Sequence, residues 1–530
     1  MQTVNQRKPS PLMSLIKSVA KVGGYTTISR VLGFIRDQLI AFTLGTGIVA
    51  DAFFVAQRFP NLFRTLFAEG AFNSAFVPLF AKKLEAHGAE EARKFANDVF
   101  LVLLTWILFF TGLCIVLMPW LIYLIAWGFQ GSAEKIALVV TLAQLCFPYL
   151  VFMTLTALQG GVLNSMNKFT AAAAAPILLN VVLILSNVIA WFYGTGNSAT
   201  TGYIFAVGVT VSGIAQYVLL AIACRKAGMS MKPAWPRLTP EVKQVVARSL
   251  PGILSGGVMQ INLLIATSIA SGIAHANSYL YYADRLYQLP LGVIGVAVGV
   301  VLLPTLSRLL RAGETEAVLA AKNRALEFSL FLTLPAAAAL MTIAAPILHT
   351  VFEHGAFKTV DTLAVAPAVV AFAAGLPAYS LTKVFQPSFY AREDTKTPMQ
   401  FAIVSVVVNI IASVVLSYFF GHVGIAMATS LAAWTNAAQL YFRLRKLGHF
   451  SFDIRNKKRL PLIILSTLIM AATLLGLSWT LQVNFAEGTH FIHALWGLLI
   501  LVGGGIVSYF MAAQLTGAFR ISELKAAFKS

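Results

Sequence analysis

Residues 29–78 read SRVLGFIRDQLIAFTLGTGIVADAFFVAQRFPNLFRTLFAEGAFNSAFVP, and this stretch decides the fold class. Arg30, Arg36, Arg58 and Arg64 lie in two segments that are otherwise apolar enough to span a bilayer. An arginine at membrane depth costs at least a few kcal/mol unless it faces water, a partner or a bundle interior. We therefore predict an interior site for an anion, and we favour it over four interface anchors or structural ion pairs.

The composition indicates an integral membrane protein. Apolar residues make up 58% of the chain and charged residues 11%, and the mean hydropathy is +0.79. Cys114, Cys146 and Cys224 show no CxxC or paired spacing, so we expect neither a disulfide framework nor a cysteine metal site. The first apolar segment has no cleavage-site pattern after it, and we interpret it as a retained span.

The apolar segments predict an all-α protein with fourteen transmembrane helices, because about 20 residues cross a bilayer. The first seven segments lie near 20–44, 50–81, 97–120, 136–165, 170–194, 200–224 and 246–273. The second seven lie near 276–307, 325–352, 361–390, 398–420, 423–442, 461–482 and 491–518.

The basic residues predict the orientation. Of the 39 lysines and arginines, 31 lie in the N-terminal tail, in every second loop or in the C-terminal tail, whereas the alternate loops hold only Lys135 and Lys358. This split places both termini in the cytoplasm of a multi-pass inner-membrane protein. It also explains the net charge of +19 through contacts with anionic membrane lipids, so we expect no nucleic-acid partner.

The chain repeats itself at an interval of roughly 220–230 residues, which predicts an internal duplication. FVPLFAKKLEAHGAEEARKF at 76–95 aligns with LLPTLSRLLRAGETEAVLAA, which starts at Leu302. Matched residues in the two halves are Pro78 with Pro304, Arg58 with Arg285, Pro148 with Pro377, and Asn180 with Asn409. Six spans in each half make the repeats parallel, and two such lobes would enclose a central cavity open to either side in turn.

The predicted organisation follows from these boundaries. The chain begins with an N-terminal tail (1–19), an N-terminal lobe (20–228) and a cytoplasmic linker (229–245). A C-terminal lobe (246–448) and a second cytoplasmic linker (449–460) follow. The chain ends with two unduplicated helices (461–518) and a cytoplasmic tail (519–530). Repeats also occur in channels, but fixed charges that bind an anion suit a carrier with a discrete site.

The quoted stretch closely resembles the signature of the MurJ (MviN) family of lipid II flippases, which act in bacterial peptidoglycan synthesis. YYADRLYQLPLGVIGVAVGVVLLPTLSRL at 281–309 and KVFQPSFYAREDTKTP at 383–398 resemble its later motifs. The resemblance implies a non-enzymatic transporter in cell wall biogenesis and cell shape. It implies that lipid II crosses by alternating access, that the last two helices form a groove for its polyprenyl tail, and that the cell-wall synthesis machinery is a candidate partner.

The resemblance also implies site residues. Arg30, Arg36, Arg64 and Arg285 match the essential arginines of the family and are expected to contact diphosphate and sugar. Arg58 stands where some members have lysine, and Ser29 and Asn61 match positions that line the cavity.

Four further residues are candidates for gating or ion pairing. Asp37 lies seven residues after Arg30, on nearly the same helix face, and could hold an arginine in place or belong to a gate. Asp51 either caps its helix or has a functional role. Glu69 is the expected internal partner of the arginines, and Pro60 predicts a kink.

Energy coupling stays open at this point. Some family members bind sodium in the C-terminal lobe, and Asn409 and Thr429 are the weak candidates here. A helical turn after Asn409 the chain has Ser413 rather than a carboxylate, which a hard cation would prefer. We expect no cofactor, with sodium, a proton or the membrane potential as the energy source.

Two other functions compete with this interpretation. The first is a related exporter of another polyprenyl-linked oligosaccharide or of a drug, although a drug exporter should carry acids in its cavity. The second is a membrane glycosyltransferase, which needs positioned carboxylates and often a metal. No DxD or HExxH motif occurs in the sequence.

Overall fold

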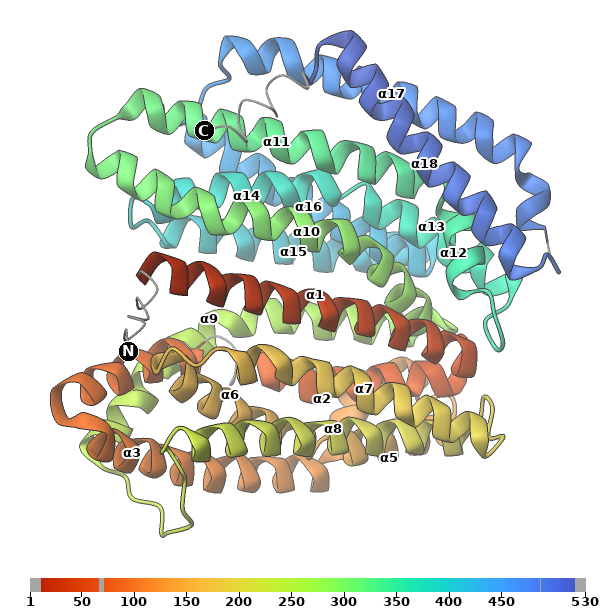
Figure 1. Cartoon of the computed structure of the whole chain (residues 1–530). Coiled ribbons are helices and arrows are strands. Elements are labelled where there is room, and N and C mark those ends of the chain that lie inside the picture. The colour runs from red at the N-terminus through yellow and green to blue at the C-terminus, as the bar shows by residue number, and fades with distance from the viewer. Residues whose placement is uncertain (1–10, 66–70, 487, 520–530) are drawn as a thin grey trace, which may run out of the picture. The chain divides into compact units, whose positions relative to one another are not determined.

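The structure is a computed structural model that describes residues 11–65, 71–486 and 488–519. Throughout these residues the chain forms helices and turns and contains no strand (Figure 1). The fold is therefore all-α, as the apolar segments predicted. The chain divides into two compact units, Met1–Leu264 and Ile265–Ser530, which are described separately.

The first unit contains a bundle built around α8. Its helices are α1 (Pro11–Leu44), α2 (Ile48–Arg64), α3 (Ala71–Val116), α4 (Met118–Ile125), α5 (Ala133–Cys146), α6 (Tyr149–Ser165), α7 (Thr170–Phe192) and α8 (Ala199–Lys226), with a short 3₁₀ turn, η2, at Trp127–Phe129. Helix α8 packs against α5, α6 and α7, and α7 also packs along α1. Helix α9 (Pro240–Ser271) continues into the second unit.

The second unit is arranged around α14 and α16, with a helix pair added outside. Its helices are α10 (Ala276–Arg311), α11 (Thr315–Thr342), α12 (Ala344–Phe352), α13 (Thr359–Ala373), α14 (Leu376–Tyr390), α15 (Lys396–Phe420), α16 (His422–Lys446), α17 (Ile454–Thr480) and α18 (Phe491–Thr516), with η3 at Gln482–Phe485. Helix α16 packs on α13, α14 and α15, while α17 packs on α11 and pairs with α18.

All fourteen predicted segments are helical along most of their described length, but several are interrupted. Helix α3 joins two predicted segments and turns at Gly88, whose φ of 80° suits glycine. Within the described residues, nine helices are long and apolar enough to cross a membrane. They are Ala75–Val116, Ala133–Ser165, Thr170–Phe192, Ala199–Lys226, Thr315–Thr342, Thr359–Tyr390, Lys396–Phe420, Ile454–Thr480 and Phe491–Thr516. The protein is thus a multi-pass membrane protein.

In each unit, one broken span is held by a neighbouring helix. The break between α13 and α14 frees backbone carbonyls, and α16 satisfies them with side chains. The Ser430 hydroxyl donates to the Ala371 carbonyl at 2.5 Å, and the Trp434 indole N–H donates to the Ala374 carbonyl at 2.9 Å. At the break between α5 and α6, the Thr210 hydroxyl of α8 donates to the Leu145 carbonyl at 2.6 Å. These bonds stabilise the breaks because a carbonyl without a partner in a membrane is costly.

In each unit an asparagine side chain hydrogen-bonds to the backbone of the linker that follows the bundle, and we call this contact an asparagine clasp. In the first unit, the Asn97 side-chain oxygen accepts from the Lys232 backbone N–H at 2.7 Å. In the second, Asn323 donates to the Ser451 carbonyl at 3.0 Å and accepts from the Asp453 N–H at 3.3 Å. The buried Lys322 adds a bond from its ammonium to the His449 carbonyl at 2.7 Å. Both linkers are therefore fixed to the bundles that they follow.

Ionic and aromatic contacts attach the added pair, α17 and α18, to the second unit. Glu327 of α11 accepts from Arg455 at 3.0 Å and from Arg459 at 2.8 Å, both on α17. Farther along, the Tyr509 hydroxyl of α18 donates to the Phe331 carbonyl of α11 at 2.6 Å. At the other end, the Thr350 hydroxyl of α12 reaches the Ala494 carbonyl at 3.4 Å. The pair is thus bonded to α11 and α12 along its length.

Gly375 provides a test of the α13–α14 break. A Cβ at this position would lie 2.5 Å from Ser430 Oγ and 2.9 Å from Ser430 Cα, and the second atom belongs to backbone. We expect Gly375→Ala to lower the free energy of unfolding by about 1–3 kcal/mol through overpacking, measured by thermal or denaturant unfolding of the detergent-solubilised protein. Gly476→Ala is the matched control, because a Cβ there meets nothing within 4 Å. The control should be neutral or stabilising by about 0.5–1 kcal/mol, since alanine favours a helix. Equal destabilisation by both variants would contradict this account of the break.

Candidate functional site

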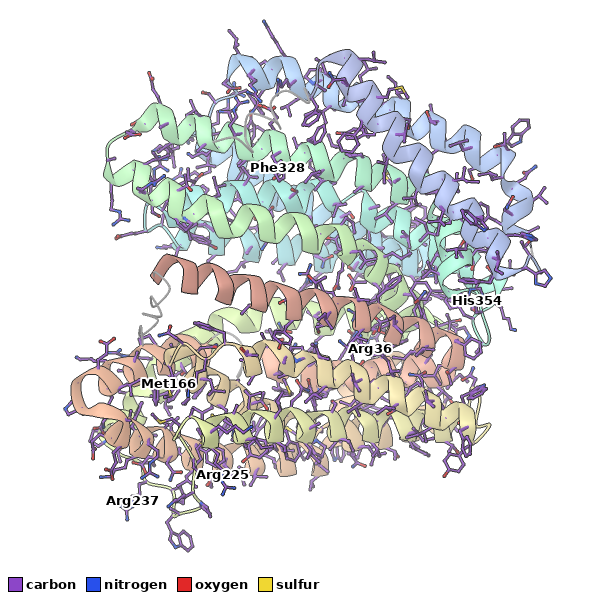
Figure 2. The ribbon with its side chains drawn as sticks, viewed as in Figure 1. Arg36, Met166, Arg225, Arg237, Phe328 and His354 are labelled. Carbon is purple, nitrogen blue, oxygen red and sulfur yellow. The ribbon has the colours of Figure 1, made fainter. Side chains whose placement is uncertain are left out.

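Arg36 lies within α1 and is held by two other side chains. It stands eight residues before the end of α1, which is about 12 Å at 1.5 Å per residue. Its Nε and Nη2 donate to Asp37 Oδ1 at 3.0 and 2.7 Å, and its Nη1 donates to Asn180 Oδ1 of α7 at 2.9 Å. Arg36 is 8% exposed and Asp37 is 3% exposed. In Figure 2 it lies partway along the first unit, away from the end at which Met166, Arg225 and Arg237 are labelled.

Ser29 belongs to the same network. The Asn180 amide N–H₂ donates to the Ser29 carbonyl at 2.8 Å and approaches the Ser29 hydroxyl at 3.3 Å. Ser29 and Arg36 are seven residues apart, so they share one face of α1. Three predicted site residues, Ser29, Arg36 and Asp37, thus meet around Asn180. Asp37 pairs with its neighbour Arg36, and no contact joins it to Arg30, from which its position was argued.

The other arginines of the first unit have different surroundings. Arg30 is exposed and makes no ion pair within the described part of the chain. Arg64 is half-buried, and its Nε donates to the Asn61 side-chain oxygen at 2.9 Å, so these two predicted residues do meet. Arg58 is half-buried six residues earlier on α2. Pro60 lies inside α2, and Glu69 lies outside the described residues.

In the second unit, Arg285 stacks on an aromatic ring. Its guanidinium carbon lies 4.6 Å from the centre of the Tyr281 ring, one turn earlier on α10. A cation over a ring face gains about 0.5–2 kcal/mol, depending on its exposure to solvent. Its neighbour Asp284 accepts from Gln288. A guanidinium can donate two parallel hydrogen bonds to a phosphate.

Asp51 forms a buried ion pair that spacing alone could not reveal. Its carboxylate lies 3.3 Å from the ammonium of Lys135, on α5, and the Asp51 side chain is fully buried. Lys135 also lies 3.9 Å from the centre of the Phe129 ring. The residue before α2 is Gly47, so Asp51 sits within the first turn and does not cap the helix. The alternative that it is a helix cap is therefore wrong.

Asn409 and Thr429, the candidate sodium ligands, lie on different helices and bond within them. Asn409 is buried in α15, where its side-chain oxygen accepts from the Ser413 hydroxyl at 3.4 Å. The Thr429 hydroxyl donates to the Ile425 carbonyl at 2.9 Å within α16. Among the described residues, no group of three or more His, Cys, Asp or Glu side chains could hold a metal ion. Amide and hydroxyl oxygens remain as the only ligands of this set that suit sodium.

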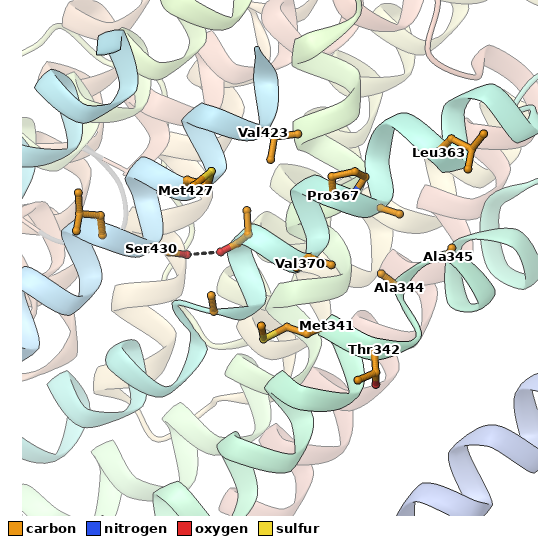
Figure 3. A pocket seen from close by; sticks show the side chains of 14 residues that line it. Met341, Thr342, Ala344, Ala345, Leu363, Pro367, Val370, Val423, Met427 and Ser430 are labelled. Carbon is orange, nitrogen blue, oxygen red and sulfur yellow. Dashed lines mark hydrogen bonds between the residues drawn. The ribbon is translucent and has the colours of Figure 1, made fainter. Parts of the chain in front are cut away.

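An apolar cavity of about 850 Å³ lies within the second unit, beside the α13–α14 break (Figure 3). It is lined from α11, α12, α13 and α16 by Met341, Thr342, Ala344, Ala345, Leu363, Ala366, Pro367, Val370, Ala371, Ala374, Val423, Met427, Ser430 and Leu431. A second cavity of about 300 Å³ shares Met341 and Ala374 with it and reaches Ile464 and Leu468 of α17. The shared residues make the two cavities neighbours along one apolar track.

Three residues were missed as site residues by the sequence reasoning. Asn180 served there only as a marker of the repeat, Lys135 only as an outer-loop cation, and Tyr281 was not singled out. A signal did exist for Asn180, because a lone amide in an apolar span must find a partner. Lys135 and Tyr281 carried no such signal, since their roles depend on which helices pack together.

Solved structures define the class of this fold. A multidrug resistance MATE family transporter of the MOP superfamily, in an inward-facing conformation, matches 79% of this chain and 95% of its own, with a TM-score of 0.64 and 15% identity. A structure described as lipid II flippase MurJ, in an inward closed conformation, matches 93% of this chain and 98% of its own, with a TM-score of 0.75 and 28% identity. The chain thus shares its fold with both of these structures.

Sequence comparisons then give the family. The family model described as lipid II flippase MurJ matches residues 40–495. A probable lipid II flippase MurJ of Rhizobium tropici is 44% identical over 97% of this chain and 96% of its own length. The lipid II flippase MurJ of Burkholderia cenocepacia is 35% identical over 82% of this chain and 85% of its own. This chain belongs to the MurJ family, as the resemblance in its sequence indicated.

The Asp51–Lys135 pair generates a stability prediction. Lys135→Met would leave a buried carboxylate without this cation, and we expect a loss of about 3 kcal/mol in the free energy of unfolding. Lys94→Met is the control, because its partner Glu91 is exposed and lies 2.9 Å away, and such pairs contribute about 0–1 kcal/mol. Adding Asp51→Asn to Lys135→Met should recover part of the loss. Additive effects of these two substitutions in a double-mutant cycle would show that the pair does not interact.

Proposed function

We propose that this chain is a transporter, and not an enzyme, that moves lipid II from the cytoplasmic to the periplasmic leaflet by alternating access. The observation that carries the proposal is Arg36, a buried guanidinium held by Asp37 and Asn180. Membership of the MurJ family supports lipid II as the substrate. The protein would deliver lipid II to the cell-wall synthesis machinery. It would thereby support peptidoglycan synthesis and cell shape.

The charge of the site suits a pyrophosphate. Arg30 is exposed, Arg64 donates to the Asn61 amide, and the Arg285 guanidinium lies over the Tyr281 ring. A phosphate diester accepts paired bonds from a guanidinium fork. We propose that Arg30, Arg36, Arg64 and Arg285 contact the head group, with Arg58, Ser29 and Asn61 beside them. The remaining candidates would then form ion pairs or take part in gating: Asp37, Asp51, Glu69 and the kink at Pro60.

Fourteen crossings in two duplicated lobes are part of the proposal. In the first unit α7 packs on α8, α6 on α8, α3 on α6 and α2 on α5; in the second, α15 packs on α16, α14 on α16, α11 on α14 and α10 on α13. The broken spans and the asparagine clasps also correspond. These matches support lobes at 20–228 and 246–448 and linkers at 229–245 and 449–460.

The distribution of basic residues supports cytoplasmic termini in the inner membrane, and exposed aromatic residues mark the opposite helix ends as membrane interfaces. Trp and Tyr are enriched at membrane interfaces, and lysine and arginine on the cytoplasmic side. The helix ends opposite the basic loops carry exposed aromatic side chains, namely Trp120, Trp127, Trp191, Tyr193, Tyr418, Phe419 and Trp479. We propose that these ends face the periplasm and that the tails at 1–19 and 519–530 face the cytoplasm.

The polyprenyl tail would follow the apolar track described above, on the α11-facing side of α17. Each CH₂ kept out of a wet, cationic site gains roughly 0.8 kcal/mol. Gly504 and Gly505 of α18 do not line this track but face α17: a Cβ would lie 2.6 Å from Leu477 and 3.0 Å from Leu474. They let α17 and α18 approach closely, and the track is lined by Ile464 and Leu468. A tail groove within 461–518 thus remains our proposal, with a different lining.

We propose that transport uses no cofactor and is driven by an ion gradient or by the membrane potential. Asn409 and Thr429 remain weak candidates for sodium. Replacing either by alanine would remove an oxygen ligand, so sodium-dependent transport would weaken if they bind the ion.

The orientation can be tested by cysteine labelling. Asn197→Cys should react with an impermeant maleimide added outside the cell, whereas Pro233→Cys should react only after the membrane is opened. The native cysteines Cys114, Cys146 and Cys224 are all buried, so the background should be low. The reverse pattern would contradict both the orientation and the duplicated topology.

The function can be tested by complementing a strain depleted of its own lipid II flippase. The wild-type chain should restore growth, and Arg36→Ala, Arg64→Ala or Arg285→Ala should abolish it at normal membrane levels of the protein. Lysine should rescue poorly because it lacks the planar fork. Arg237→Ala is the control, since Arg237 lies exposed on the linker, and it should grow normally. Normal growth of all three site variants would exclude the arginine site.

A further inference from the structure

Asn180 connects two helices at the place where Arg36 is held. It lies on α7, is 5% exposed, and contacts α1 at two points. Its amide oxygen receives Arg36 Nη1 at 2.9 Å, and its amide nitrogen donates to the Ser29 carbonyl at 2.8 Å. Gly33 lies between these points on the same face, and a Cβ there would lie 3.6 Å from the amide. The amide therefore packs directly against α1.

The orientation of this amide is determined by both of its neighbours. A guanidinium can only donate hydrogen bonds, and a backbone carbonyl can only accept them. The oxygen of Asn180 must therefore face Arg36, and the nitrogen must face Ser29. Flipping the amide would place two acceptors together and two donors together. Neither aspartate nor leucine can make both bonds.

The chemistry of this contact suits a cation that must later bind an anion. Asp37 already supplies one negative charge to Arg36, through Nε and Nη2. Because Asp37 already balances the charge of Arg36, a second carboxylate would make the site negative and repel a phosphate, whereas a neutral amide fixes the guanidinium without adding charge.

We infer that Asn180 is a positioning residue for substrate binding: with Asp37 it orients the Arg36 guanidinium toward the pyrophosphate. This inference rests on the proposed function. Asn180 acts through Arg36 and need not touch the substrate. The role of Asn180 differs from general packing between α1 and α7 because its hydrogen-bond partner, Arg36, is charged.

The chain provides a matched control two turns along α7. Asn187 is 3% exposed and faces α1 in the same way, seven residues after Asn180. Its side-chain oxygen accepts from the Thr43 hydroxyl at 3.1 Å, and Thr43 lies seven residues after Arg36. Both amides thus bridge the same two helices, but only Asn180 contacts an arginine in these bonds.

The experiment measures the movement of fluorescent lipid II across the membrane of proteoliposomes that contain the full chain. The half-saturating lipid II concentration and the maximal rate are fitted separately. Asn180→Leu should raise the half-saturating concentration about tenfold, the size expected for a lost bond to a charged group. Asn180→Asp keeps an acceptor for Arg36 but adds charge, and it should raise that concentration further. Asn187→Leu should change it less than about twofold. Thermal unfolding of each variant shows whether the two leucine variants are equally stable.

The outcomes separate the inference from the proposed function. If wild-type and Arg36→Ala proteins behave as proposed but Asn180→Leu and Asn187→Leu shift half-saturation equally, Asn180 only packs the helices and the inference is wrong. The inference is also wrong if Asn180→Asp binds lipid II better than Asn180→Leu, because repulsion was expected. If the wild-type chain moves no lipid II, the proposed function falls and the inference falls with it.

Discussion

The cost of placing a guanidinium in a low-dielectric span is the constraint on which the site depends. Arginine does not lose its proton at any accessible pH, so the protein must give it a partner, a water-filled space or an aromatic face. The described arginines use different solutions: Arg36 is held by a carboxylate and an amide, Arg64 by Asn61, and Arg285 by the Tyr281 ring. Each solution restricts the orientation of a guanidinium fork, whose geometry would let it donate paired hydrogen bonds to a phosphate.

Local features of the sequence predicted most of the helices, because a continuous apolar run in a membrane has to satisfy its backbone bonds internally. The interruptions were less predictable. Pro148 and Pro377 lie at or just after two of them, but Pro176 and Pro335 lie inside unbroken helices. What decides is whether a neighbouring helix offers a donor to the exposed carbonyls. Ser430 and Thr210 do so, from helices that are distant in sequence.

The site was predictable in its cations but not in their partners. Periodicity shows which residues share a helix face, and on that basis Asp37 was related to Arg30. The structure pairs Asp37 with Arg36, because adjacent side chains can meet when both turn toward the same neighbouring helix. Asn180 is 144 residues from Arg36, and Lys135 is 84 residues from Asp51. Such pairings depend on tertiary packing, which no spacing within one helix encodes.

The clasped linkers also bear on how the chain is made. Asn97 is synthesised well before Lys232, and Asn323 well before Asp453, so each clasp can form only after the helix preceding its linker has left the ribosome. The first clasp closes within the first unit and needs no residue of the second. Insertion can therefore advance by finishing one bundle before the next begins, and α17 and α18 join last, after the linker that Asn323 holds.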